Sequence, residues 1–473
     1  MNLSDFSMKL KDLCNRKDVT IKGLADDCNI DRTFLHKIIK GERKPPNVEF
    51  VHEISKQLRL TEEEKEELLM QYRIIEMGEK VYLRRQKVAG IIHDIANKKF
   101  ESEKSIDFRT EIDVNKIPEV TTFYEQKEFI KNIQIIVSYD IQHGSDLKII
   151  AQPSENLNNI LRYCVGSNEK CQVRHVFCLD NANNEQNDVN YNLEVFPLIC
   201  DFAVENFGYK PFYYYDNAAL HINSSAVLPY AIITDNFVVC FDRNFSEGIV
   251  YKSQSLVKFY NNIYSKFETQ SMALTEVTND VIDMVNCFYD YKNYTINFDY
   301  QPCTVCAVDE KMYNKHVVVG DDLKKWLGEV VINQQKYFLN STTVNLFCEE
   351  GLEMFMNEGT IVEIPNGMYT PPDIEERQFI LKKIIEFTEK DECKFRIIKN
   401  NLLKSSPNLC VNIINNKMLK IITRKNESMN FSYININEMS LVEAFTDYFV
   451  YLCESDDICT KEETISIMKK YIH

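Results

Sequence analysis

The pattern of apolar and polar positions changes once along the chain, near residue 120. Before that point apolar side chains recur at intervals of three and four residues, which is typical of amphipathic helices. Residues 100–118 are polar and without a period, and we interpret them as a linker or an irregular connection. The predicted helices cover 5–16, 21 to a turn at 28–31, 32–40, 48–60, 61–77 and 79–99.

Beyond residue 120, strand patterns alternate with helical ones. This alternation is typical of a layered α/β domain. The first predicted elements are helix 121–141, strand 147–152, helix 154–165 and strand 171–179.

The most informative feature downstream is an internal repeat. One unit begins near Asn192 and a second near Glu376, and each runs helix, strand, hairpin, short strand, helix. The hairpin turns are predicted at Asp235-Asn236 and Asn415-Asn416. Between the units the pattern predicts helix 271–289, an irregular segment over 294–319, strand 342–350 and helix 351–359.

Two short helices near the N-terminus flank a tight polar turn, Cys28-Asn29-Ile30-Asp31. Thr20 and Asp31 are N-cap residues for the two helices, and Gly41 ends the second one. When the apolar positions turn inward, the outward face of the second helix is cationic and rich in hydrogen-bond donors. Such a helix can enter the major groove of DNA, with flanking basic residues on phosphates. The face consists of Arg32, Thr33, His36, Lys37 and Lys40.

These residues resemble the XRE/Cro-repressor family of bacterial and phage DNA-binding domains over residues 1–60. The pattern comprises Leu24-Ala25, Ile30-Asp31, Leu35, Ile38, Gly41, Arg43 and Pro45. The resemblance implies base-reading positions at Arg32, Thr33, His36 and Lys37. It also implies contacts to the DNA backbone from Thr20, Lys22, Lys40 and Arg43.

The chain departs from the family pattern at three positions. The family often has Gln at the first residue of the second helix, where this chain has Ile21. An expected Arg–Glu ion pair between helices one and three is replaced by Cys14 and Ile39. Losing both partners strands no charge and can be neutral or stabilising, so the fold prediction stands.

The order of elements in the C-terminal repeat is similar to that of phospholipase D-like folds, in which two halves face each other across a cleft. Their active site needs a His, a Lys two residues later and an Asp further on, once per half. Neither repeat contains this set. No phosphate-binding loop, nucleophile elbow or HExxH motif is present either, and His143, His175, His221 and His316 are isolated. We therefore predict no enzymatic activity and no catalytic, cofactor-binding or metal-binding residues.

Composition bears on DNA binding, on the cellular compartment and on metal binding. The 473 residues carry a formal charge of -16, yet basic residues concentrate early, which is compatible with a DNA-binding patch on an acidic body. The 15 cysteines, the absence of a signal-peptide pattern and the absence of a long apolar run predict a cytoplasmic protein without a membrane segment. Cys303 and Cys306 form the only close Cys pair, with no second pair to complete a zinc site.

Together these patterns predict a multidomain protein. It has an all-α helix-turn-helix domain (1–60), a helical connector and linker (61–118), and a large α/β (α+β) region with an internal duplication. The two α/β halves are placed at 119–290 and 291–473. The leading hypothesis is a transcriptional regulator that binds an operator as a homodimer and senses a small molecule, peptide or protein in a cleft between the halves. Two alternatives remain: an enzyme or defence effector with an autoregulatory DNA-binding domain, and an interaction protein in which the repeat only oligomerises.

Overall fold

The computed structural model describes residues 3–97, 116–166, 170–181, 190–205, 208–222, 228–278, 294–338, 342–362, 364, 367–399, 407–425 and 430–472. The chain forms two compact units, Met1–Lys87 and Val88–His473.

The first unit is helical, as the apolar spacing predicts. Its core is built from one face of each helix, with Leu10, Leu24, Leu35, Ile54 and Leu68 all fully buried. The helices are α1 (Leu3–Arg16), α2 (Ile21–Asp27), α3 (Arg32–Ile39), α4 (Val48–Gln57), α5 (Glu62–Met77) and the first part of α6 (Glu79–Asn97).

The helix ends in this unit are fixed by local hydrogen bonds. At the end of α2, Asn29 has a φ of 53°, and the Ile30 amide donates to the Ala25 carbonyl at 2.9 Å. At the end of α3, Gly41 has a φ of 74°, and the Glu42 amide donates to the Lys37 carbonyl at 2.8 Å. Both are left-handed C-terminal caps that reverse the chain tightly. The predicted turn and the predicted stop at Gly41 are therefore confirmed.

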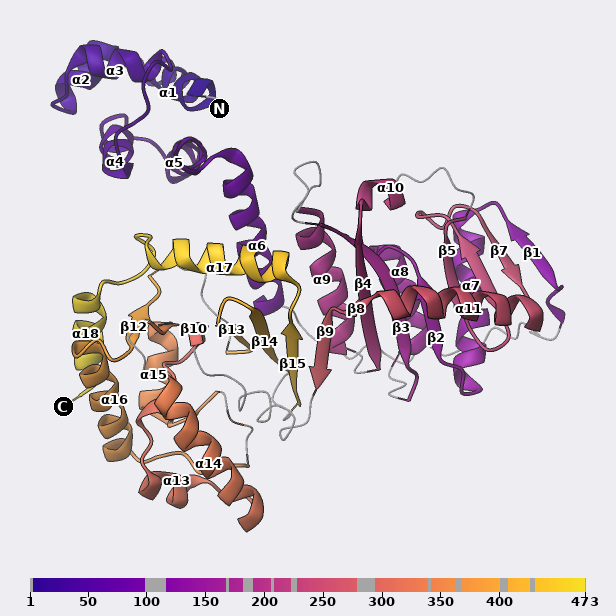
Figure 1. Ribbon diagram of the computed structural model, residues 1–473. Coiled ribbons are helices and arrows are strands. Elements are labelled where there is room, and N and C mark those ends of the chain that lie inside the picture. The colour runs from indigo at the N-terminus through magenta and orange to yellow at the C-terminus, as the bar shows by residue number, and fades with distance from the viewer. Residues whose placement is uncertain are drawn as a thin grey trace. The chain divides into compact units, whose positions relative to one another are not determined.

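The second unit contains two mixed sheets with helices between their strands (Figure 1). The strands and helices of the first sheet region are β1 (Val120–Phe123), α7 (Gln126–Gln142), β2 (Leu147–Ile150), α8 (Glu155–Val165), β3 (Val173–Asp180), α9 (Asn190–Glu205), β4 (Tyr209–Asp216), α10 (Ala218–Ile222), β5 (Tyr230–Ile233), β6 (Val238–Phe241), β7 (Gly248–Tyr251), α11 (Gln254–Gln270) and β8 (Met272–Ala273).

The second sheet region follows the same scheme with additions. Its elements are β9 (Thr275–Thr278), β10 (Tyr294–Phe298), a 3-10 turn η2 (Val305–Ala307), α13 (Glu310–His316), α14 (Asp321–Phe338), β11 (Val344–Phe347), α15 (Glu349–Glu358), α16 (Ile374–Glu389), β12 (Lys394–Ile397), β13 (Leu409–Ile414), β14 (Met418–Lys425), β15 (Asn430–Ile436), α17 (Met439–Cys453) and α18 (Lys461–Lys469).

The two sheets have the same strand order. The first runs β1-β7-β6-β5-β2-β3-β4 with β8 added at its edge, and the second runs β9-β15-β14-β13-β10-β11-β12. The parallel pairs β2–β3 and β3–β4 correspond to the parallel pairs β10–β11 and β11–β12. The predicted fold class, a helical N-terminal domain followed by an α/β region with an internal duplication, is confirmed. Both predicted hairpin turns also lie where the sequence places them.

Three predictions for the connecting segments are wrong. Residues 120–123 form β1, paired with β7, so the predicted helix 121–141 begins only at 126. Residues 272–278 form β8 and β9, paired with β4 and β15, where a helix was expected; positions 279–289 of that helix lie outside the described residues. Residues 294–319, expected to be irregular, contain β10, η2 and α13. In each case long-range pairing or packing overrides a weak local signal.

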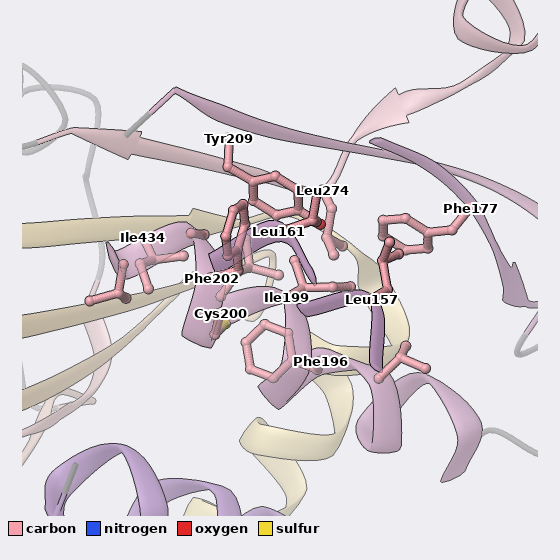
Figure 2. Close-up of a cluster of buried hydrophobic side chains, with 14 of the residues drawn as sticks. Leu157, Leu161, Phe177, Phe196, Ile199, Cys200, Phe202, Tyr209, Leu274 and Ile434 are labelled. Atoms are coloured by element: carbon pink, nitrogen blue, oxygen red, sulfur yellow. The ribbon is translucent and has the colours of Figure 1, made fainter. Parts of the chain in front are cut away.

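One hydrophobic core joins the two sheet regions. Helix α9 packs against α17, and the rings of Phe196 and Phe445 meet edge to face with centroids 6.0 Å apart. Figure 2 shows Phe196, Ile199 and Phe202 of α9 beside Leu157 of α8, with Ile434 of the second sheet in the same cluster. The halves are therefore packed together by side chains from both repeats.

Candidate nucleic-acid interface

The pair α2 and α3 is held rigidly from within the first unit. The Thr20 hydroxyl accepts from the Gly23 amide at 3.0 Å, and the Asp31 carboxylate accepts from the Phe34 amide at 2.8 Å. The buried Ser7 hydroxyl of α1 donates to the Ile38 carbonyl at 2.6 Å. With both N-caps formed and its inner face tied to α1, α3 presents a fixed outer face.

The residues singled out from the sequence lie on that outer side. Arg32, Thr33, His36 and Lys37 belong to α3, Lys40 is its C-cap residue, Thr20 and Lys22 begin α2, and Arg43 lies in the loop that follows α3. All are exposed except His36, which is half-buried. Thr33, Lys37 and Lys40 are spaced by four and three residues and so share one helix face.

The early basic residues fall into two electrostatic groups. Lys9 and Arg16 of α1, and Lys17 directly after it, are paired with acids of α5: Lys17 Nζ lies 2.8 Å from Glu64, Arg16 Nη1 lies 3.5 Å from Glu64, and Lys9 contacts Glu67. The hydrogen bond from Lys17 holds the pKa of Glu64 below its ordinary value. The charge of α1 is therefore largely balanced within the unit.

The second group has no such partners. Within the part of the chain that the structure describes, Lys22, Arg32, Lys37 and Lys40 form no ion pair. Their positive charge faces solvent from α2, α3 and the end of α3. The structure therefore separates these solvent-facing cations of α2 and α3 from Lys9, Arg16 and Lys17, which are paired with α5.

Arg43 is positioned by an aromatic contact that the sequence analysis missed. Its guanidinium carbon lies 4.6 Å from the ring centroid of Phe34, which in turn meets Phe50 edge to face at 5.8 Å. The neighbouring Lys44 donates to the carbonyl of Ile75 at 3.2 Å. Phe34 is half-buried: it packs against the edge of the hydrophobic core and also supports the basic loop. A stacked guanidinium is pre-organised for a phosphate because fewer rotamers are lost on binding.

The departures from the family pattern are accommodated in the core. Cys14 and Ile39 are 3% and 7% exposed and lie in the same hydrophobic cluster. Burial raises the pKa of the Cys14 thiol to about 11, so the group is neutral and apolar at physiological pH. Ile21 packs against the edge of this cluster. No charge is stranded by the loss of the ion pair.

The four histidines singled out from the sequence in the second unit have structural partners. His143 Nδ1 lies 2.7 Å from the Tyr139 carbonyl, and His221 Nε2 lies 2.9 Å from Asp216. His175 is buried and bonded on both ring nitrogens. Over the described ranges, no group of three His, Cys, Asp or Glu side chains is arranged to hold a metal ion, and no helix is long and apolar enough to cross a bilayer.

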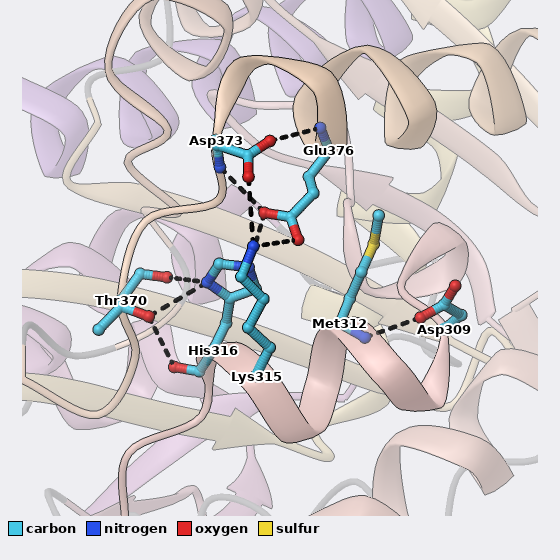
Figure 3. A network of polar contacts seen from close by, with 7 residues as sticks. All are labelled: Asp309, Met312, Lys315, His316, Thr370, Asp373 and Glu376. Atoms are coloured by element: carbon cyan, nitrogen blue, oxygen red, sulfur yellow. Dashed lines mark hydrogen bonds and ion pairs between the residues drawn. The ribbon is translucent and has the colours of Figure 1, made fainter.

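Figure 3 shows the polar cluster around His316, which joins α13 to the start of α16. Lys315 Nζ lies 2.7 Å from Glu376 and 3.2 Å from Asp373, and His316 Nε2 lies 2.8 Å from Glu376. His316 Nδ1 lies 2.9 Å from the Thr370 carbonyl. The carboxylates are already paired or capping, so the cluster fastens two helices together.

At the junction of the two halves, polar contacts accompany the shared core. The Tyr215 hydroxyl donates to the carboxylate of Glu438 at 2.6 Å, and Asn192 donates to the Ser440 hydroxyl at 2.9 Å. Glu438 is 1% exposed and accepts from two amides at the start of α17. These contacts tie the first repeat to the second.

Comparison with known proteins adds a distant similarity of fold. No protein-family model matches the chain, and no curated protein matches it by sequence. Among solved structures, phosphatidylserine synthase of Haemophilus influenzae Rd KW20 matches with a TM-score of 0.22 and 8% identity, over 81% of this chain and 97% of that one. TrmBL2, an archaeal chromatin protein that binds DNA, gives 0.22 and 12%, over 54% and 87%. Polyphosphate kinase of Porphyromonas gingivalis gives 0.23 and 6%, over 77% and 55%. At these scores the similarity is remote.

Proposed function

We propose that the protein is a sequence-specific DNA-binding transcriptional regulator with an XRE-type helix-turn-helix in residues 1–60. One observation carries the proposal: the exposed cations of α2 and α3 are unpaired within the described residues, while Lys9, Arg16 and Lys17 are paired with acids of α5. An unpaired basic face on a capped helix is suited to a polyanion because binding needs no internal ion pair to break.

In the proposed complex, α3 lies in the major groove. Arg32, Thr33, His36 and Lys37 face base edges there, and the exposed side chains of Lys22, Lys40, Arg43 and Thr20 meet phosphates on either side. We further propose a homodimer on an inverted repeat, with half-sites about one helical turn apart. The duplicated α/β region then acts without catalysis, by sensing a ligand or partner that changes DNA affinity.

The test is genome-wide occupancy of the intact protein together with binding to the operator recovered from it. We expect sharp peaks at a palindromic site that disappear in the Arg32→Ala/Lys37→Ala variant. On the isolated operator, each lost base contact should cost about 1–3 kcal/mol.

A matched control removes two cations that are already paired, Lys9→Ala/Lys17→Ala. This variant should keep the same peaks. The slope of log affinity against log salt concentration should hardly change, whereas each lost phosphate contact makes that slope shallower by about 0.9. Occupancy without discrete sites, or equal losses in both double variants, would contradict the proposal.

A further inference from the structure

The two halves share seven strand positions but differ in several connections, among them the one that follows β2 in the first half and β10 in the second. In the first half, residues 151–172 join β2 to β3 and contain the single helix α8. In the second half, the corresponding residues 299–343 join β10 to β11 and contain η2, α13 and α14. Figure 1 shows α13 and α14 side by side as a helical hairpin on this half. The second half therefore has more helical structure in this connection than the first half has.

The hairpin is anchored firmly to the second sheet region. The side-chain amide of Gln335 donates to the carbonyls of Val305 at 2.9 Å and Val308 at 2.6 Å. On the sheet side, Val330 and Trp326 of α14 pack with Tyr433 of β15. The cluster of Figure 3 fastens the end of α13 to α16. A ligand held by the hairpin would therefore be coupled to the sheet and to α16.

A groove of about 360 Å³ runs along the hairpin between α13 and α14. Its floor is the ring of Tyr313, which lies against Gly328: a Cβ at that position would meet the ring at 3.2 Å. The Tyr313 hydroxyl donates to the Lys324 carbonyl at 2.6 Å and fixes the ring. Ile332, which is 50% exposed, forms an apolar wall. The volume lies at the lower end of the range for small-molecule sites, about 300–1,000 Å³.

The rim of the groove is acidic. Glu310, Asp321 and Glu329 line it with exposed carboxylates that form no ion pair within the described residues. Lys324 is turned aside, with Nζ donating to the Asn314 carbonyl at 2.8 Å, which leaves Lys325 as the opposing charge. An apolar floor under a net negative rim complements a cation with an apolar body.

We propose that the groove between α13 and α14 binds a small organic cation with an aromatic or aliphatic body. The ammonium group lies at the carboxylate rim, and the apolar body covers Tyr313 and Ile332. This site goes beyond the DNA-binding proposal, since binding itself does not require DNA. Only its role as the effector site of a regulator rests on the proposed function.

The chain carries its own reporter for the test. Trp326 is the single tryptophan in the sequence and lies on α14. Full-length protein without DNA is titrated with benzyltriethylammonium while Trp326 emission is followed. We expect a saturable change that weakens at high salt, and no saturable change with the neutral probe 2-phenylethanol.

Matched charge variants test the rim. Asp321→Asn/Glu329→Gln should weaken binding of benzyltriethylammonium about tenfold, since each exposed charge contributes up to about 1 kcal/mol. The control Glu353→Gln/Glu392→Gln removes two exposed acids away from the groove and should leave the affinity unchanged. Gly328→Val should displace the Tyr313 ring and reduce binding further.

Four outcomes would overturn the proposal, three of them from binding measurements. These three are the absence of a saturable response, equal affinity in the rim variant and its control, and binding of a lysine-rich amphipathic peptide where benzyltriethylammonium does not bind. Self-association that Ile332→Glu abolishes would also overturn it, because the groove would then be an interface between copies. Failure to find an operator would refute the DNA-binding proposal and leave these titrations unaffected.

Discussion

Protonation of one buried histidine should make the stability of the second unit depend on pH. His175 lies in β3 with 1% of its surface exposed. Its Nε2 donates to the Ala151 carbonyl at 2.9 Å, and its Nδ1 accepts from the Tyr209 hydroxyl at 2.8 Å. Both partners are satisfied by the neutral ring, and burial lowers the pKa of His175 to about 4. The cation is therefore strongly disfavoured in the folded state.

The direction of this pH dependence follows from the difference in proton binding between the folded and the unfolded chain. An unfolded histidine has a pKa of about 6.5, so between that pH and about 4 the unfolded chain binds a proton that the folded chain does not. Stability is fully present above about pH 6.5 and is lost as the pH falls toward 4. With these two pKa values, the loss between about pH 7.5 and pH 5 amounts to roughly 2 kcal/mol from this residue alone.

The assay is urea unfolding of the full chain at both pH values, followed by Trp326 emission, for the native protein and for His175→Gln. Glutamine keeps one donor and one acceptor and does not titrate, so the other groups cancel in the difference between the two proteins. We expect the native protein to lose roughly 2 kcal/mol more than the variant on acidification. Identical pH dependence in the two proteins would refute the assignment of a neutral buried ring.

Three further substitutions test the packing. Gly351→Ala should destabilise the fold by at least about 1–3 kcal/mol in urea unfolding, because the new Cβ would lie 1.8 Å from the Tyr300 carbonyl oxygen. Gly90→Ala, in α6, should instead raise the free energy of unfolding by about 0.5–1 kcal/mol, because the added Cβ would have no neighbouring atom within 4 Å; a lower free energy of unfolding would show an unexpected contact. Asp140→Ala should cost about 2–5 kcal/mol, since this fully buried carboxylate accepts from the amide and the side chain of Asn236 at 3.1 and 3.0 Å; hydrogen exchange at the hairpin turn should rise in parallel.

Much of the local structure was determined by the sequence alone. The helical spacing, the N-cap residues Thr20 and Asp31, and the stop at Gly41 act within a few residues, so they could be recognised without the fold. The repeat could also be recognised, because both halves need the same alternation to bury one face of a strand and one side of a helix. The residues expected to contact DNA were chosen on the same local grounds, and their contacts with DNA stay a prediction.

Tertiary structure decided what depends on distant partners. The strands β1, β8 and β9 are short and carry little signal of their own; they form because β7, β4 and β15 offer free edges. The separation of α1 cations from α3 cations depends on acids of α5 that lie about fifty residues further along, beyond the reach of any local pattern. The placement of Arg43 over Phe34 and the groove between α13 and α14 likewise arise only when separate segments pack together, because contact across space is not encoded in the period of either segment.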